Sequence, residues 1–421
     1  MRKLLSVTTF TGMLTLLRMA AGFLMAKVIA VYLGPSGMAM LGQVQNIVAI
    51  LNGIISAPIS PALIRYTAQY YDGGYRQCIP WWRASLGWVL IFMLILMPLM
   101  ILFSHDLSLW LFSSKQYSYL VLAIVLCLPF SVLGIIINAV NNGVQNYKKY
   151  IGLGMLSVIA STAIMIFLVI YGSVKGALLA ISIQSGIIGV VLFICSVKEP
   201  WLKISYWVGT IDRDKFLYIF RYILMALISA LVFPLALLII RNTLIDLEGW
   251  NVTGQWQAVW KISDAYLSVM TLALSTYYLP LLSKLDNLHD LRREIKSISK
   301  VIIPITILLS SVIYFSSGLI VRVLFTEEFK DAESLFLIQL IGDNVKIIAW
   351  LYAYPLIAYG IAKWYIIAEI SFALLFIFLG RLLISNYGVS GANWAYLLSY
   401  VIYFCFVFIV MNKVVIFSRK G

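Results

Sequence analysis

Charge is scarce in this sequence. Only 11% of the 421 residues are Asp, Glu, Lys or Arg, and there are just 2 histidines and 4 cysteines. Soluble proteins carry about a quarter charged residues, so this composition excludes an ordinary soluble enzyme. No polar stretch is long enough for an extramembrane domain, and the cysteines follow neither a disulfide nor a metal-site pattern. We therefore expect no metal and no cofactor.

Apolar residues are correspondingly abundant. They make up 62% of the chain, and the mean hydropathy is +0.97. A bilayer needs about 20 apolar residues per helical crossing. The sequence therefore predicts an all-α polytopic membrane protein with twelve spans, at 5–33, 38–64, 84–104, 118–141, 151–172, 176–196, 216–241, 254–282, 301–324, 334–358, 362–386 and 389–412.

Basic residues predict the orientation. With both termini in the cytoplasm, the cytoplasmic segments hold twenty Lys and Arg and the outer segments hold six, which are Lys115, Lys175, Arg241, Arg322, Lys330 and Arg381. Such an excess marks the cytoplasmic side of membrane proteins. The net charge of +14 is therefore read as a topology signal, and no nucleic acid is expected as a partner.

Two halves of the chain resemble each other. Gly42-Gln43 recurs as Gly254-Gln255, and Gly176-Ala177 recurs as Gly391-Ala392. A repeat of six spans returns to the same side, so the two bundles share one orientation and enclose the working site. We expect a first lobe at 1–197, a cytoplasmic linker at 198–215 and a second lobe at 216–421.

Polar residues inside the spans are the candidate site, because a charge at the bilayer centre is costly without a partner or a wet cavity. In span 8 a stripe with helical spacing faces one side, and it comprises Gln257, Lys261, Asp264 and Ser268. Its counterpart on span 2 includes Gln45 and Asn52. The stripe predicts a hydrophilic cleft between lobes; the alternative is an ion pair of Lys261 with Asp264 in helix packing.

Five other intramembrane residues are candidates. Asp343 and Lys346, three residues apart on span 10, suit a structural ion pair or ion coupling, and Glu369 suits a protonatable group or a structural acid. Arg18 lies near the centre of span 1 with no acid on its helix. Its fork suits phosphate, so it binds a substrate anion or pairs with an acid of another helix. Lys27 is a further candidate for the anion, although nine residues place it on the opposite face of an ideal helix.

The second half also carries specific segments, namely Trp256-Gln257, Trp260, Ile262-Ser263-Asp264-Ala265-Tyr266-Leu267, Tyr278-Leu279-Pro280, Gly342-Asp343 and Ala368-Glu369. With these, the chain resembles the Wzx-type flippases of the MOP exporter superfamily, which handle O-antigen and lipid III units. The resemblance implies two six-helix bundles around a central cationic cavity lined by spans 1, 2, 7 and 8. It also implies a bacterial inner-membrane location, with a polysaccharide polymerase and a chain-length regulator as candidate partners.

The expected function is outward flipping of an undecaprenyl-diphosphate-linked oligosaccharide, such as an O-antigen repeat unit. In this hypothesis Arg18, Lys27 and Lys261 bind the diphosphate, and the polyprenyl tail stays among the membrane lipids. A cation or drug antiporter of the same superfamily is the nearest alternative, but it needs an acidic cavity. An O-antigen polymerase would need a large outer loop, so we expect a transporter and no enzyme.

Overall fold

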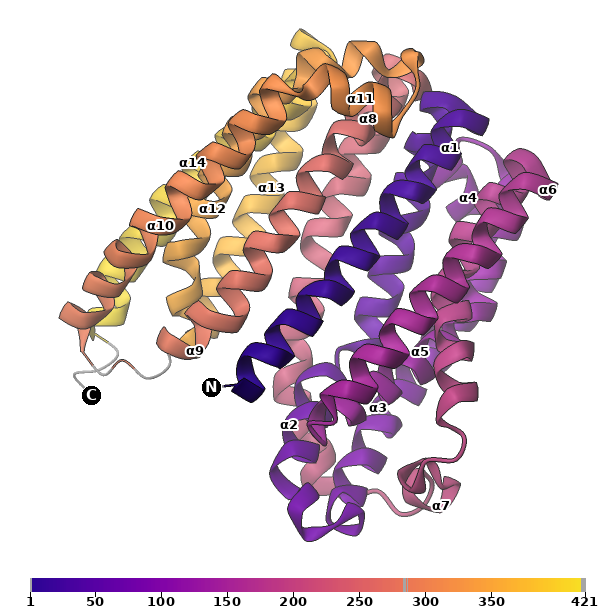
Figure 1. Cartoon of the computed structure of the whole chain (residues 1–421), viewed down its shortest axis with the longest axis vertical. Helices are drawn as coiled ribbons and strands as arrows, with labels where there is room; N and C mark the ends of the chain where they lie inside the picture. The colour runs from indigo at the N-terminus through magenta and orange to yellow at the C-terminus, as the bar shows by residue number, and fades with distance from the viewer. Residues whose placement is uncertain (1, 283–284, 286, 418–421) are drawn as a thin grey trace. The chain divides into compact units, whose positions relative to one another are not determined.

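A computed structural model describes residues 2–282, 285 and 287–417. Within these ranges every regular element is a helix (Figure 1), which confirms the all-α prediction. The chain divides into two compact units, Met1–Tyr32 with Met40–Leu235 and Leu33–Ala39 with Ala236–Gly421. These units are defined by contacts within the chain, and their boundaries differ from those of the predicted lobes and linker. The lobes and the linker stay a prediction.

The first unit is built around packed helices from the first half of the chain. Helix α5 packs along α6, and α2 contacts both α3 and α5. Its elements, with the short 3-10 turns η1 to η3, are α1 (Arg2–Ser56), α2 (Ser60–Tyr70), η1 (Tyr71–Gly73), α3 (Tyr75–Leu102), α4 (Ser104–Phe112), η2 (Lys115–Tyr117), α5 (Ser118–Gly143), α6 (Tyr147–Ser196), η3 (Pro200–Leu202), α7 (Ile204–Trp207) and the start of α8 (Arg213–Ala273).

The second unit contains the rest of α8 and the helices that follow. Helix α14 packs against α12 and α13, and α10 packs against α12, so the four run side by side in Figure 1. Its further elements are the π-helical turn η4 (Leu274–Tyr278), α9 (Leu279–Leu282), α10 (Leu288–Phe315), α11 (Ser317–Leu324), the 3-10 segment η5 (Glu327–Leu335), α12 (Phe336–Ala358), α13 (Ala362–Tyr387) and α14 (Val389–Phe417).

Ten segments in the described ranges are long and apolar enough to cross a membrane. The protein is therefore a multi-pass membrane protein. Eight segments each overlap one predicted span, although His289–Phe315 begins and ends well before the predicted 301–324. Two are much longer, 47 residues at Phe10–Ser56 and 57 residues at Ala226–Leu282, and each covers a pair of predicted spans.

A glycine interrupts each of these two long elements. Gly34 in α1 has φ 61° and Gly249 in α8 has φ 82°. Glycine tolerates positive φ because it has no Cβ. The two glycines lie 215 residues apart, close to the spacing of the sequence repeat, so each half carries its kink at the equivalent place.

Two further structural features each occur once in each unit, a glutamine–carbonyl hydrogen bond and a close backbone contact at a glycine. The Gln43 amide donates to the Leu111 carbonyl at 3.1 Å, and the Gln255 amide donates to the Glu328 carbonyl at 2.6 Å. A Cβ on Gly176 would lie 2.0 Å from the Leu168 carbonyl oxygen. On Gly391 it would lie 2.1 Å from the corresponding oxygen eight residues back, that of Leu383. The repeat seen in the sequence therefore extends to backbone anchoring and helix packing.

Candidate functional site

Three members of the polar stripe of α8 lie on the less buried face of the helix, where Lys261 and Ser268 are half-buried and Asp264 is exposed. The fourth member, Gln257, is buried, at 3% exposed. On the opposite face the apolar side chains are all buried, at Val259, Ile262, Leu267 and Leu274. The Ser268 hydroxyl donates to the Ala265 carbonyl of its own helix at 2.7 Å. The second unit therefore presents Lys261 and Asp264 on a face that its own core leaves uncovered.

The predicted counterpart in the first unit has the same pattern without charge. Gln45 and Asn52 are half-buried on α1, and Ala49 between them is exposed. The Ser131 hydroxyl of α5 donates to the Asn52 side-chain oxygen at 2.7 Å. This face is polar and neutral, and Asn52 is fixed by a neighbouring helix.

Arg241, one of the six basic residues predicted on the outer side, has a buried side chain that is 1% exposed. Its guanidinium donates to the Gln257 side-chain oxygen at 2.7 Å and lies 5.8 Å from the centre of the Trp256 ring. Arg241 and Gln257 each stand eight residues from Gly249, so the chain reversal at this glycine brings them together. The two equal spacings can be counted in the sequence, but they predict a contact only when the chain is known to reverse at Gly249.

Asp343 of α12 is the centre of a buried hydrogen-bond network. Its side chain is 0% exposed. It accepts hydrogen bonds at 2.9 Å from the hydroxyls of Tyr266 on α8 and Tyr396 on α14, and one at 3.3 Å from the Gln339 amide. Buried carboxylates need such donors, because an unsatisfied charge in a low-dielectric interior is very costly. Asp343 thereby ties together three helices of the second unit.

Lys346 lies one helical turn from Asp343 and is held by aromatic rings. Its amine is 5.0 Å from the centre of the Trp350 ring, 5.4 Å from that of Tyr400 and 5.7 Å from that of Tyr396. Ring faces attract cations, and the attraction is stronger away from water. The sequence indicated Lys346 itself but gave no sign of the two tyrosines, which come from α14.

Glu369 of α13 joins the same region. It is half-buried, and the Tyr403 hydroxyl donates to one of its carboxylate oxygens at 2.9 Å. Lys346 interacts electrostatically with this carboxylate and with those of Asp264 and Asp343. The structure therefore brings together the acidic candidates of the second unit around one lysine.

The six charged side chains of this region balance one another. Asp264 interacts electrostatically with Lys346, Lys261 and Arg241, and Lys346 in turn reaches the other two carboxylates. We call these six residues the charge cluster: Arg241, Lys261, Asp264, Asp343, Lys346 and Glu369. Three positive and three negative groups make it neutral overall, which limits the cost of burying its three buried members, Arg241, Asp343 and Lys346.

The remaining candidates belong to the first unit. Arg18 and Lys27 lie on the first arm of α1, where the Arg18 side chain is exposed and that of Lys27 is half-buried. No acidic residue precedes Asp72 in the sequence. The structure therefore places the three predicted diphosphate ligands in two units, with Arg18 and Lys27 in the first and Lys261 in the second. Their role stays a prediction.

Comparison with known proteins identifies the family. The model of the polysaccharide biosynthesis protein family matches residues 4–286, about two thirds of the chain. The chain belongs to this family. Two curated relatives, the lipid III flippases of Escherichia coli (strain K12) and Shigella flexneri, are each 29% identical to it over 419 residues. Each alignment covers 97% of this chain and 99% of the relative, so the likeness extends over the whole length.

Solved structures support the fold at lower sequence identity. An inward-facing multidrug resistance MATE family transporter of the MOP superfamily superposes with a TM-score of 0.73 at 15% identity, over 99% of both chains. The lipid II flippase MurJ in an inward closed conformation superposes with a TM-score of 0.71, also at 15% identity, over 97% of this chain and 88% of that one. At this identity the two structures show a shared fold, while the expected resemblance to lipid III flippases is confirmed by the two curated relatives.

Proposed function

We propose that this member of the polysaccharide biosynthesis protein family is a flippase for a polyprenyl-diphosphate-linked oligosaccharide. The full-length similarity to two lipid III flippases supports this most directly, because it covers 97% of the chain and both halves of the repeat. The cargo in this proposal is an undecaprenyl-diphosphate-linked unit, such as an O-antigen repeat unit. It moves from the cytoplasmic to the periplasmic leaflet of the inner membrane.

Twelve crossings with both termini in the cytoplasm are part of the proposal. A helix rises about 1.5 Å per residue and a bilayer core is about 30 Å thick. The segments of 47 and 57 residues are each long enough to cross twice, and each contains a positive-φ glycine where the chain can reverse. Reporter fusions test this: fusions after Gly34 and Gly249 should report the outside, and a fusion at the C-terminus the inside.

The diphosphate would be bound by cations of α1 and α8. Arg18 and Lys261 are accessible to a ligand, since one is exposed and the other half-buried on a face that its unit leaves uncovered. A guanidinium can bind phosphate through two parallel hydrogen bonds, and an ammonium acts as a point charge. The neutral polar side chains of Gln45 and Asn52 then offer hydrogen-bonding partners for sugar hydroxyls.

The membrane potential favours this direction of transport. Moving one elementary charge across 100 mV is worth about 2.3 kcal/mol. Two negative charges leaving a negative interior therefore gain about 4.6 kcal/mol at that potential. Rocking of the two bundles around the bound glycan completes the proposed cycle, and no covalent chemistry on the substrate is required.

Complementation of flippase-deficient cells tests the proposal. Wild-type protein should remove the lipid-linked glycan that accumulates on the inner leaflet. Arg18→Ala and Lys261→Ala should each reduce the rate at least tenfold, while Arg18→Lys should retain part of it. Arg381→Ala is the matched control, because this arginine is exposed on α13 and outside the charge cluster. Inserted, folded Arg18→Ala and Lys261→Ala proteins that flip at the wild-type rate would refute the binding role. Failure of the wild type with every lipid-linked glycan offered would refute the function itself.

A further inference from the structure

The segment between α6 and α8 is folded onto the first unit. We call residues 197–212 the docked segment; it contains η3 and α7. Trp201 is 1% exposed, and the Trp207 indole donates to the Trp201 carbonyl at 3.0 Å. The ring of Trp207 stacks on that of Trp82 from α3, with ring centres 4.9 Å apart.

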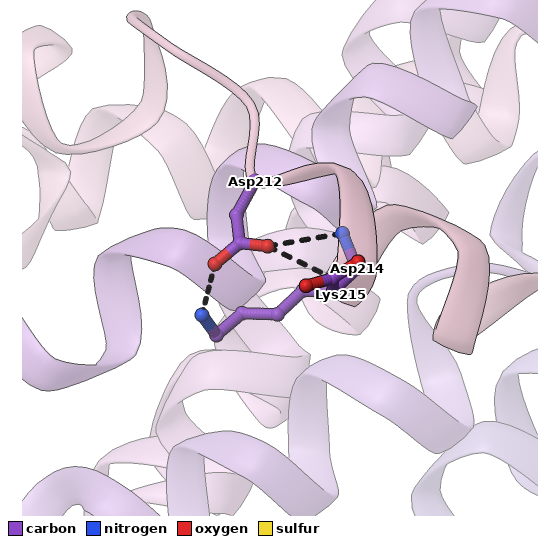
Figure 2. Close-up of polar contacts among 3 residues, drawn as sticks. All are labelled: Asp212, Asp214 and Lys215. Atoms are coloured by element: carbon purple, nitrogen blue, oxygen red, sulfur yellow. Dashed lines mark hydrogen bonds and ion pairs between the residues drawn. The ribbon is translucent and has the colours of Figure 1, made fainter.

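Arginine and lysine side chains fix this segment further. The Arg83 guanidinium of α3 donates to the Ser205 carbonyl at 2.7 Å, and Lys149 at the start of α6 forms an ion pair with Glu199. At the other end Asp212 accepts from the backbone amides of Asp214 and Lys215 at 3.1 and 3.3 Å and pairs with the Lys215 amine (Figure 2). The docked segment, which overlaps the predicted linker at 198–215, thus packs against α3 and pairs with the start of α6.

Despite this anchoring, the docked segment leaves large apolar side chains uncovered. Ile204 is 78% exposed, Val208 63% and Ile211 48%. They follow one another at intervals of four and three residues, and the first two also line a pocket. This pocket has a volume of about 180 Å³. Its other lining residues are likewise apolar: Leu86, Leu133, Ile136, Phe193, Leu202 and Trp207.

The same end of the first unit is basic. The ranges 65–83, 145–150 and 197–215 are linked by the Arg83–Ser205 and Lys149–Glu199 contacts. They contain nine Lys and Arg residues but only four Asp and Glu. Lys198, Lys203 and Arg213 are exposed, and Lys203 directly precedes α7. Basic residues next to an apolar membrane-facing surface attract anionic lipid headgroups.

We propose that this pocket is a binding site for an anionic phospholipid of the surrounding bilayer. One acyl chain enters the apolar pocket beneath α7, and the headgroup lies against the exposed basic residues that flank it, Lys203 foremost. Ile204, Val208 and Ile211 then rest among neighbouring acyl chains, as the apolar face of an interfacial helix does. The site is separate from the charge cluster, which belongs to the second unit, and it does not depend on the proposed cargo.

Photolabelling of the full-length protein in lipid nanodiscs tests the site. The probe is phosphatidylglycerol with a diazirine in one acyl chain, and labelled peptides are identified by mass spectrometry. We expect labelling in residues 197–211 and in α3 near Leu86. Unlabelled phosphatidylglycerol should compete at least fivefold better than phosphatidylcholine. Lys203→Glu should reduce labelling about fivefold or more, because one basic residue near an anionic surface contributes about that factor.

Matched variants separate the site from general lipid contact. Ile204→Asp with Val208→Asp should remove most of the labelling. Both side chains are exposed, so the variant should fold, and gel filtration checks this. Leu102→Asp is the apolar control, since Leu102 is 77% exposed at the far end of α3. Lys175→Glu is the charge control, exposed in the middle of α6. Equal labelling by phosphatidylcholine, or equal loss in the controls, would overturn the proposal. So would displacement by undecaprenyl phosphate at lower concentration than by phosphatidylglycerol, which would assign the pocket to a prenyl chain.

Discussion

Replacing Lys346 by methionine removes the cation that three carboxylates share. Methionine keeps the length and apolar stem of the side chain, so the change is mainly one of charge. Lys346 is 5% exposed and Asp343 is 0% exposed, so neither can be compensated by bulk water. Removing one partner of a buried pair costs about 3–5 kcal/mol, because the other charge stays buried and uncompensated. We expect Lys346→Met to lower the free energy of unfolding by about that amount.

The double variant isolates the electrostatic part. In Lys346→Met combined with Asp343→Asn, position 343 is neutral. The two tyrosine hydroxyls donate to different oxygens of Asp343, so the amide oxygen accepts from one of them, and the other hydroxyl turns to accept from the amide NH2. Residues in one network show coupling energies of about 0.5–3 kcal/mol. Since both groups are buried, we expect a value near the upper end, so the double variant should cost about 2–3 kcal/mol less than the two single variants added together.

Unfolding by SDS titration in mixed micelles measures these free energies. Lys363→Met is the control, because Lys363 is exposed at the start of α13 and its loss should change stability by less than about 0.5 kcal/mol. If the costs of Lys346→Met and Asp343→Asn are additive to within about 0.5 kcal/mol, the two residues are not coupled and the charge cluster is not one electrostatic unit.

Two further predictions concern packing and pH. Gly391→Ala should destabilise the protein by about 1–3 kcal/mol, because its Cβ would meet the Leu383 backbone at 2.1 Å. Gly152→Ala should be neutral or stabilising by up to about 1 kcal/mol, since nothing lies within 4 Å of its Cβ; thermal unfolding in detergent compares the two. For Asp212, the hydrogen bond from the Lys215 side chain holds the pKa of the carboxyl below its usual value. A group with a lowered folded pKa stabilises the folded state above its unfolded pKa, and this contribution is lost as the pH falls through the folded pKa. Carboxyl ¹³C NMR should therefore show Asp212 titrating below free aspartate, and Lys215→Met should move its pKa back up; an unchanged pKa in that variant would contradict the assignment.

The sequence predicted the elements of the fold better than the partners within the site. Apolar runs of bilayer length and recurring glycines follow from local composition, so the membrane-spanning helices and the repeat could be predicted from the sequence, while the count of twelve spans stays a prediction. Asp343 is different, because its donors Tyr266 and Tyr396 stand 77 and 53 residues away on other helices. Spacing along one helix indicates Lys346 as its neighbour and gives no sign of the tyrosines. The rings of Tyr396 and Tyr400 around Lys346 were missed for the same reason.

The sequence also could not predict which polar residues at the ends of apolar runs are buried. Arg241 ends a predicted span, where a basic residue normally reaches water, and only the reversal at Gly249 sets it beside Gln257. The docked segment carries both charge and tryptophan, a composition equally typical of a solvated linker. Its position depends on Trp82 and Arg83, which lie more than a hundred residues earlier in the chain.

The two halves share the same backbone features but differ in charge. We expect this difference in charge to be related to function. Both have a positive-φ glycine at the reversal and a glutamine anchored to a later carbonyl. At the repeat offset, however, Ala49 becomes Lys261 and Asn52 becomes Asp264. A duplicated scaffold needs no charge there to fold, because the first half forms the same helix with neutral residues. The charges of the second half therefore add a property that packing alone does not require. Exchanging them tests this: Lys261→Ala with Asp264→Asn gives the second half the residues of the first, and it should preserve insertion while abolishing transport.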